Sequence, residues 1–113
     1  MKELLAILEE EISIMEPEDA EEEATLRSME SALPKIRDEG PAASLTPDER
    51  EAVKYALEDV GELYCFTGTS AGFDTDGLTK KDVKEHQGRG WKAREQAAAL
   101  GIHLGGGYET KAH

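Results

Sequence analysis

Two apolar stripes of identical spacing in the first 40 residues constrain this chain most. Each stripe holds four large apolar residues separated by three, four and three positions, which places them on one face of an α-helix. The stripes are Leu5, Leu8, Ile12 and Met15, and then Leu26, Met29, Leu33 and Ile36. The spacing predicts one helix over residues 3–15 and a second that begins at Pro17 or Asp19 and ends at Gly40. Because the link between them is short, we expect an antiparallel helical hairpin, kinked or broken at Pro34, which lacks an amide donor.

A strong signal for a third helix follows at Thr46. Its hydroxyl can cap the helix, Pro47 stands where a missing N–H costs nothing, and Glu49 can reach back to the cap. We therefore expect a capped third helix over residues 47–64, after a linker at 41–46.

Glycine is concentrated in the second half of the chain, where it sets the expected turns. The sequence predicts a glycine-rich loop at 68–77, with a minor short strand over 63–67 as an option before it. Thr79 then supplies another cap, and the helix that it opens is expected to run to residue 100 with an interruption at residues 88–90.

These segments predict a mainly α fold, a small helical bundle. The chain has 113 residues, which suits one small hydrophobic core. We expect a single domain over residues 1–104, made of an acidic helical hairpin (1–40), the linker, and the remainder of the bundle (47–104). Residues 105–113 are glycine-rich and polar, and they are predicted to form a flexible tail.

The composition excludes several classes of protein. The formal net charge of −12 argues against direct binding of nucleic acid or of an anionic membrane surface. No apolar run approaches the length of a membrane span. A single cysteine, Cys65, allows neither an intramolecular disulfide nor a zinc site of paired cysteines, so a reducing, cytoplasmic location is expected.

The acidity is concentrated in the predicted hairpin, whose 40 residues hold 13 carboxylates and four basic side chains. Carboxylates at residues 18–23 lie at the start of the second helix, where the helix dipole favours them. Four others lie toward the C-terminal end of the first helix, where the dipole disfavours them: Glu9, Glu10, Glu11 and Glu16. A merely solvated acidic face would also explain this run. We interpret these four as a surface for a basic protein partner, or for the basic segment at 80–94 of a second copy.

That basic segment supports a different hypothesis. Residues 79–100 hold six basic and three acidic side chains around the only tryptophan. Arg89, Trp91 and Lys92 could bind a small molecule or a phosphate anion together with the glycine-rich loop. A core role for Trp91 is the simpler interpretation.

The candidates for metal binding and catalysis are weaker. Asp74, Asp76 and Asp82 resemble the middle of a calcium loop, but both terminal ligands of such a loop are missing. Asp82 could orient His86, and Cys65 could act as a nucleophile if the fold brought it near. An exposed histidine and an inert buried cysteine explain the same residues, so no catalytic residue and no cofactor is predicted.

The sequence therefore favours a small acidic protein that acts by binding and is not an enzyme. Its expected role is that of a regulator or inhibitor whose carboxylate-rich helical surface contacts a basic partner, such as a protein that handles nucleic acid. Two alternatives remain. One is the anion binder described above, and the other is an oligomeric assembly component whose hairpin stripes contact other copies.

Overall fold

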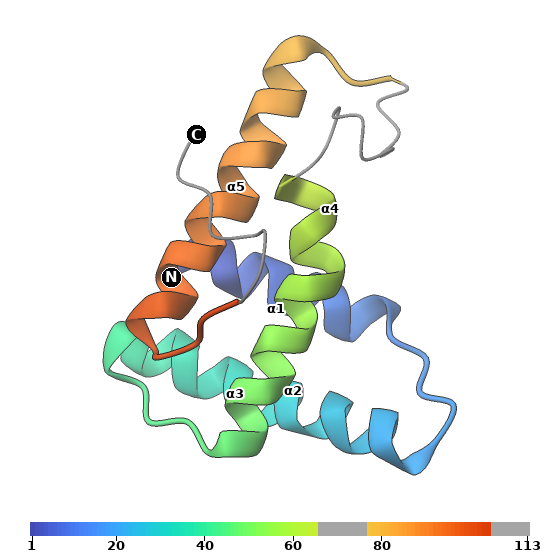
Figure 1. Cartoon of the computed structure of the whole chain (residues 1–113), viewed down its shortest axis with the longest axis vertical. Coiled ribbons are helices and arrows are strands. Elements are labelled where there is room, and N and C mark those ends of the chain that lie inside the picture. Colours follow the sequence, from blue (N-terminus) through green and yellow to red (C-terminus); the bar gives the residue numbers. More distant parts are fainter. Residues whose placement is uncertain (66–76, 105–113) are drawn as a thin grey trace.

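The computed structural model describes residues 1–65 and 77–104, and these residues are mainly helical (Figure 1). The elements are α1 (Lys2–Ile14), α2 (Ala20–Glu39), the 3-10 turn η1 (Gly40–Ala42), α3 (Pro47–Ala56), the π-helical turn η2 (Leu57–Gly61), α4 (Glu62–Cys65) and α5 (Lys80–Ala99). No strand occurs within these two ranges. The predicted α class is confirmed.

Three helix pairs enclose the core. α1 packs against α5, α2 packs against α3, and α4 packs against α5, while α1 also contacts α2 and η2. In Figure 1, α3, η2 and α4 follow one another as a continuous rod, with α5 beside its upper part and α2 across its base. The buried apolar residues with the largest side chains are Leu4, Ile7, Leu8, Met29, Ile36, Val53, Leu57 and Val60.

The buried face of α1 is rotated from the predicted stripe. Leu5, Ile12 and Met15 are only partly buried, whereas the buried positions are Leu4, Ile7, Leu8 and Glu11. The physical reason is that α1 contacts α2, α3, α5 and η2, so its buried face is wider than the stripe of a two-helix contact. This rotation places the carboxyl group of Glu11 in the interior.

The helix starts follow the predicted capping signals. Asp19 accepts a hydrogen bond of 2.8 Å from the backbone N–H of Glu22 at the start of α2. Thr46 forms a reciprocal capping box with Glu49, and Thr79 forms one with Asp82. α5 ends as predicted, because Gly101 adopts a left-handed φ of 81° and the N–H of Ile102 donates to the Ala97 carbonyl.

The predicted break at Pro34 and the predicted interruption at residues 88–90 are wrong. α2 runs unbroken through Pro34, whose ring is exposed, so water can satisfy the carbonyl left without a partner. α5 runs unbroken through residues 88–90. Gly90 is buried against α4, and a Cβ there would lie 2.7 Å from both the backbone nitrogen and Sγ of Cys65. This glycine permits close helix packing and does not act as a hinge.

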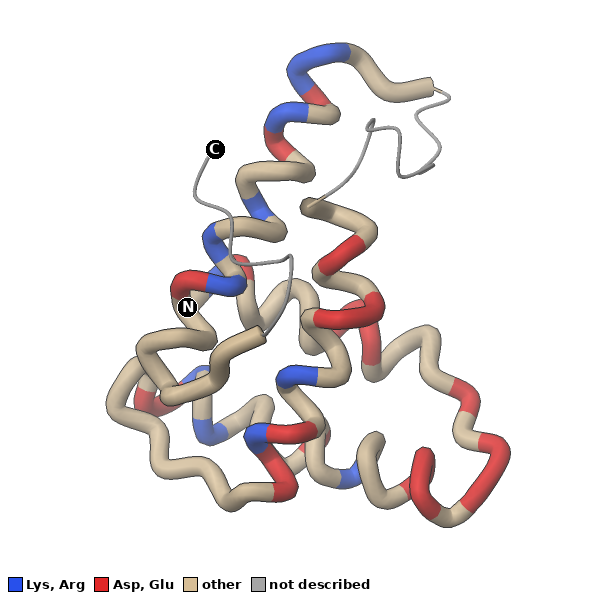
Figure 2. Tube along the Cα trace, viewed as in Figure 1, with Lys and Arg blue, Asp and Glu red and all other residues tan. Residues whose placement is uncertain are grey.

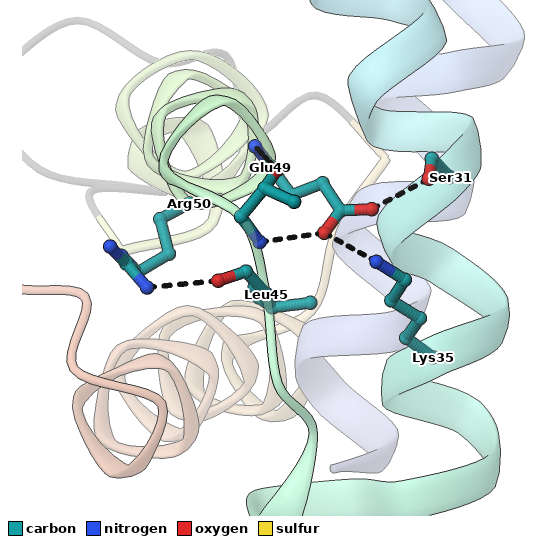
Figure 3. Close-up of polar contacts among 6 residues, drawn as sticks. Ser31, Lys35, Leu45, Glu49 and Arg50 are labelled. Atoms are coloured by element: carbon teal, nitrogen blue, oxygen red, sulfur yellow. Dashed lines mark hydrogen bonds and ion pairs between the residues drawn. The ribbon is translucent and has the colours of Figure 1, made fainter.

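Glu49 joins α2 to α3 (Figure 3). Its carboxylate is 3% exposed and accepts hydrogen bonds from Ser31 Oγ at 2.6 Å, Lys35 Nζ at 2.8 Å and the N–H of Thr46 at 2.8 Å. Burial raises the pKa of Glu49, but the bonds from Lys35, Ser31 and Thr46 outweigh it and lower the pKa to about 2. The predicted cap residue is therefore also a buried tertiary contact.

The start of α1 is capped by α5. Met1 provides no capping side chain, and the N–H of Leu4 instead donates to Oε1 of Gln96 at 2.9 Å. Gln96 also donates to Glu3 through Nε2 at 2.7 Å. A side chain from the other end of the sequence thus satisfies a helix N-terminus.

The optional strand, the glycine-rich loop, the tail and the linker remain to be compared with the structure. Residues 63–65, where a strand was an option, belong to α4. Three predicted parts lie outside the described residues: residues 66 and 67 of the optional strand, residues 68–76 of the glycine-rich loop, and the tail at 105–113. The predicted linker at 41–46 carries Leu45, which is buried in the core. Along the described helices, none is both long and apolar enough to cross a membrane.

Candidate functional site

A pocket at the C-terminal end of α1 is lined by five carboxylates. It has a volume of about 290 Å³ and lies where α1, the start of α2, α3 and η2 meet. Its lining residues are Glu11, Ile14, Met15, Glu16, Glu18, Glu22, Tyr55 and Asp59. No lysine or arginine is among them, so its electrostatic potential is that of carboxylates.

A second acidic pocket, of about 470 Å³, lies between α2 and α3. Its lining residues are Glu21, Ala24, Thr25, Ser28, Asp48, Glu51, Ala52, Tyr55 and Glu58. Again no basic side chain takes part. Tyr55 lines both pockets, so they adjoin at this ring, and we call the residues of the two pockets together the acidic face.

Apolar side chains are exposed on the same face. Of the three large hydrophobic residues that are exposed in residues 1–65 and 77–104, Ile14 and Tyr55 line the first pocket, with 55% and 42% of their surface accessible. Burial raises the pKa of the Tyr55 hydroxyl, and the nearby carboxylates of Asp59, Glu11 and Glu22 raise it further. The acidic face therefore offers both charge and apolar surface to a ligand.

Six basic residues lie along α5, and five others lie on α2 and α3. Figure 2 shows Lys and Arg along α5, whereas Asp and Glu dominate the link from α1 to α2 and the side formed by α3 and η2. The lysines of α5 at positions 80, 81, 84 and 92 are all exposed. None of these lysines lines either acidic pocket.

The four predicted partner-binding glutamates do not share one surface. Glu9 and Glu16 are exposed, and Glu16 lines the first pocket. Glu10 is half-buried and accepts a hydrogen bond of 2.6 Å from the Tyr64 hydroxyl. Glu11 is 1% exposed, so it cannot contact the flat surface of a partner. Partner binding remains a prediction for Glu9, Glu10 and Glu16, and Glu11 lies at the interior end of the pocket.

Sequence reasoning missed most of the acidic face. The carboxylates at residues 18–23 had a local explanation in the helix dipole, and those of α3 and η2 lie 25 or more positions further along the chain. The contact of α2 with α3 brings the two groups together. Tyr55 carried no sequence signal beyond being an aromatic residue in a charged helix.

The residues of the predicted anion site face different partners. The Arg89 guanidinium lies 5.4 Å from the centre of the Tyr64 ring, and the Arg94 guanidinium lies 5.0 Å from that of Trp91. Lys92 is exposed. Arg89 and Trp91 are two positions apart on a helix, so they point in different directions. Anion binding by these residues stays a prediction.

The candidates for metal binding and catalysis lie apart or have structural roles where they are described. Asp82 accepts from the N–H of Thr79 as part of the α5 cap, and Asp74 and Asp76 lie outside the described residues. His86 packs edge-on against Tyr64, with ring centres 5.3 Å apart. Cys65 is buried, which raises the pKa of its thiol. In the part of the chain that the structure describes, no three His, Cys, Asp or Glu side chains are arranged to hold a metal ion.

The geometry of the acidic face is the main guide to function. This face presents many carboxylates around one exposed aromatic ring, and such groups complement a cation or a basic surface. No family model, curated protein or solved structure matches this chain.

Proposed function

We propose that this protein binds a basic, amphipathic segment of a partner protein through its acidic face. The observation that carries the proposal is the coincidence of nine carboxylates with the exposed side chains of Ile14 and Tyr55. A purely solvated face would need no exposed apolar groups beside the charges. A segment with lysine or arginine on one side and aliphatic residues on the other complements both features.

The charge layout gives this surface a specific role. Carboxylates gathered on one side attract a basic partner over distance and exclude acidic ones, which affects association rate and partner choice more than affinity. The apolar contacts with Ile14 and Tyr55 would then slow dissociation. Such a protein acts as a regulator or inhibitor, because it occupies a basic surface with which its partner would otherwise bind another ligand, for example nucleic acid.

Self-association is a second candidate that the same layout favours. The exposed lysines of α5 in one copy could contact the acidic face of another copy. Sedimentation at low ionic strength separates the two candidates. A protein that remains a monomer at high concentration excludes assembly through these surfaces.

A labelled amphipathic peptide with lysine and leucine at helical spacing tests the proposal. At low salt, fluorescence anisotropy should show binding that weakens as salt is added. The triple variant Glu21→Gln, Glu51→Gln and Glu58→Gln removes three charges from the acidic face. With up to about 0.5 kcal/mol lost per charge, its affinity should fall about tenfold.

A matched variant controls for net charge. Glu30→Gln, Asp38→Asn and Glu39→Gln remove the same charge from exposed positions of α2 that line neither pocket. Its affinity should stay within about twofold of the wild type. Equal loss in both triple variants would show that the peptide responds to overall charge, and the proposal would be overturned.

A further inference from the structure

Glu11 lines the first pocket, and one oxygen of its carboxyl group has no hydrogen-bond partner. The residue is 1% exposed and lines the pocket, and its Oε1 atom has no hydrogen-bond partner. A buried polar atom without a partner is costly, and native proteins contain few of them. The atom therefore lacks the hydrogen-bond donor that a buried oxygen needs, and the pocket that Glu11 lines is the side from which a donor could reach it.

The groups that face Glu11 are acidic. Burial, a hydrogen bond to Asp59 and the charges of Asp59 and Glu10 raise the pKa of Glu11 to about 8. Tyr55 of α3, Glu22 of α2, and Glu16 and Glu18 of the link complete the lining, and Ile14 and Met15 are its apolar members. A protonated Glu11 can donate to Asp59 while the pocket is empty. A cation that entered would take the place of that proton.

The size and chemistry of the pocket select the cation. A volume of about 290 Å³, at the lower end of the size of ligand pockets, leaves room for one side chain of a partner. A metal ion is disfavoured, because no three ligating side chains in the described residues are arranged to hold one. An ammonium group is strongly hydrated and offers a point charge. A guanidinium is less hydrated, binds two carboxylates through a planar fork and stacks on aromatic rings.

We propose that this pocket receives one arginine side chain of the partner, whose guanidinium group bridges Glu11 and Asp59 and lies against the ring of Tyr55. The inference rests on the proposed function and specifies its partner, because the bound basic segment must carry an arginine at the position that meets this pocket. The remaining carboxylates of the acidic face then contact the other basic residues. A single buried anchor within a polar surround is a common arrangement in protein interfaces.

Two peptides that differ only in their basic residue test the arginine. The first is the lysine and leucine peptide described above, and in the second each lysine is replaced by arginine. At pH 8 the wild type should bind the arginine peptide about tenfold more tightly than the lysine peptide. Glu11→Gln keeps the size of the side chain but cannot become an anion, so it should reduce this ratio to about one. Asp59→Asn, at an exposed position that also lines the pocket, should reduce the ratio as well, because it removes the second carboxylate that the guanidinium bridges.

The pH dependence gives an independent readout. Because the guanidinium replaces a proton on Glu11, affinity for the arginine peptide should fall by about tenfold per pH unit as the pH drops from 8 toward 6. Glu11→Gln should show no such fall, and any contribution of the histidines is present in both proteins and cancels. The carboxyl carbon of Glu11, followed by nuclear magnetic resonance, should titrate at lower pH when the peptide is bound.

The outcomes separate this inference from the function on which it rests. If the wild type binds both peptides equally, and only the triple variant of the acidic face weakens them, the arginine pocket is overturned and the proposed function stands. If an arginine preference is lost in Glu11→Gln while both triple variants behave alike, the pocket stands and the wider acidic face does not. Absence of binding to either peptide at low salt overturns both.

Discussion

Gly90 of α5 and Cys65 of α4 approach so closely that a Cβ on the glycine would lie 2.7 Å from both the nitrogen and the sulfur of the cysteine. Gly88, two residues earlier, is exposed, and a Cβ on Gly88 would meet no neighbouring element within 4 Å. The two glycines of one short motif therefore have different constraints, and the fold depends on only one of them.

Alanine at each of these positions should change stability in opposite directions. Gly90→Ala forces α4 and α5 apart, and such overpacking should lower the free energy of unfolding by about 1–3 kcal/mol. Gly88→Ala should raise it by up to about 1 kcal/mol, because alanine favours the helix and no neighbour obstructs it. Urea unfolding followed by circular dichroism measures both. Two shifts of the same sign would contradict the close packing of α5 on α4.

Glu49 should contribute stability that depends on its charge. Its pKa of about 2 lies below the usual value of 4.5, so the contribution is fully present above pH 4.5 and is lost as the pH falls toward 2. Glu49→Gln should lower the free energy of unfolding by about 3 kcal/mol at pH 7. The difference from the wild type should shrink below pH 4. Glu51→Gln, in the exposed part of the same helix, should change stability by less than about 0.5 kcal/mol.

The helix boundaries could be predicted because their determinants are local. Asp19, Thr46 and Thr79 each accept a hydrogen bond from a backbone N–H three residues later, and Gly101 turns left-handed directly after α5. Each of these contacts lies within a few positions of sequence. No knowledge of the tertiary fold is needed to recognise them.

The contacts between helices could not be predicted in the same way. The cap of α1 is supplied by Gln96, which follows it by most of the chain length. A glycine that interrupts a helix cannot be distinguished by sequence from one that lets another helix pack closely. An interruption was therefore predicted at Gly90, where the structure shows close packing against α4. The acidic face depends on the packing of α2 beside α3, and the interior position of Glu11 depends on α1 contacting four elements.

The buried Glu11 should make stability fall as the pH rises through neutrality. Its pKa is about 8 in the folded protein against about 4.5 when unfolded, so the folded state holds the proton more tightly. The stabilisation is complete below pH 4.5 and is lost as the pH rises through 8, with a slope of at most about 1.4 kcal/mol per pH unit. Urea unfolding across this range should show the slope in the wild type and not in Glu11→Gln.

The exposed neighbour Glu9 provides the matched control for this effect. Glu9→Gln removes one carboxylate from the same helix without altering the pocket, so its stability curve should run parallel to that of the wild type. A wild-type curve parallel to that of Glu11→Gln would mean that Glu11 is ionised at neutral pH in the folded protein. If the slope is found, saturating arginine peptide should reduce it, because the guanidinium stabilises the ionised carboxylate in the folded state. Stability and recognition would then depend on the same buried carboxylate.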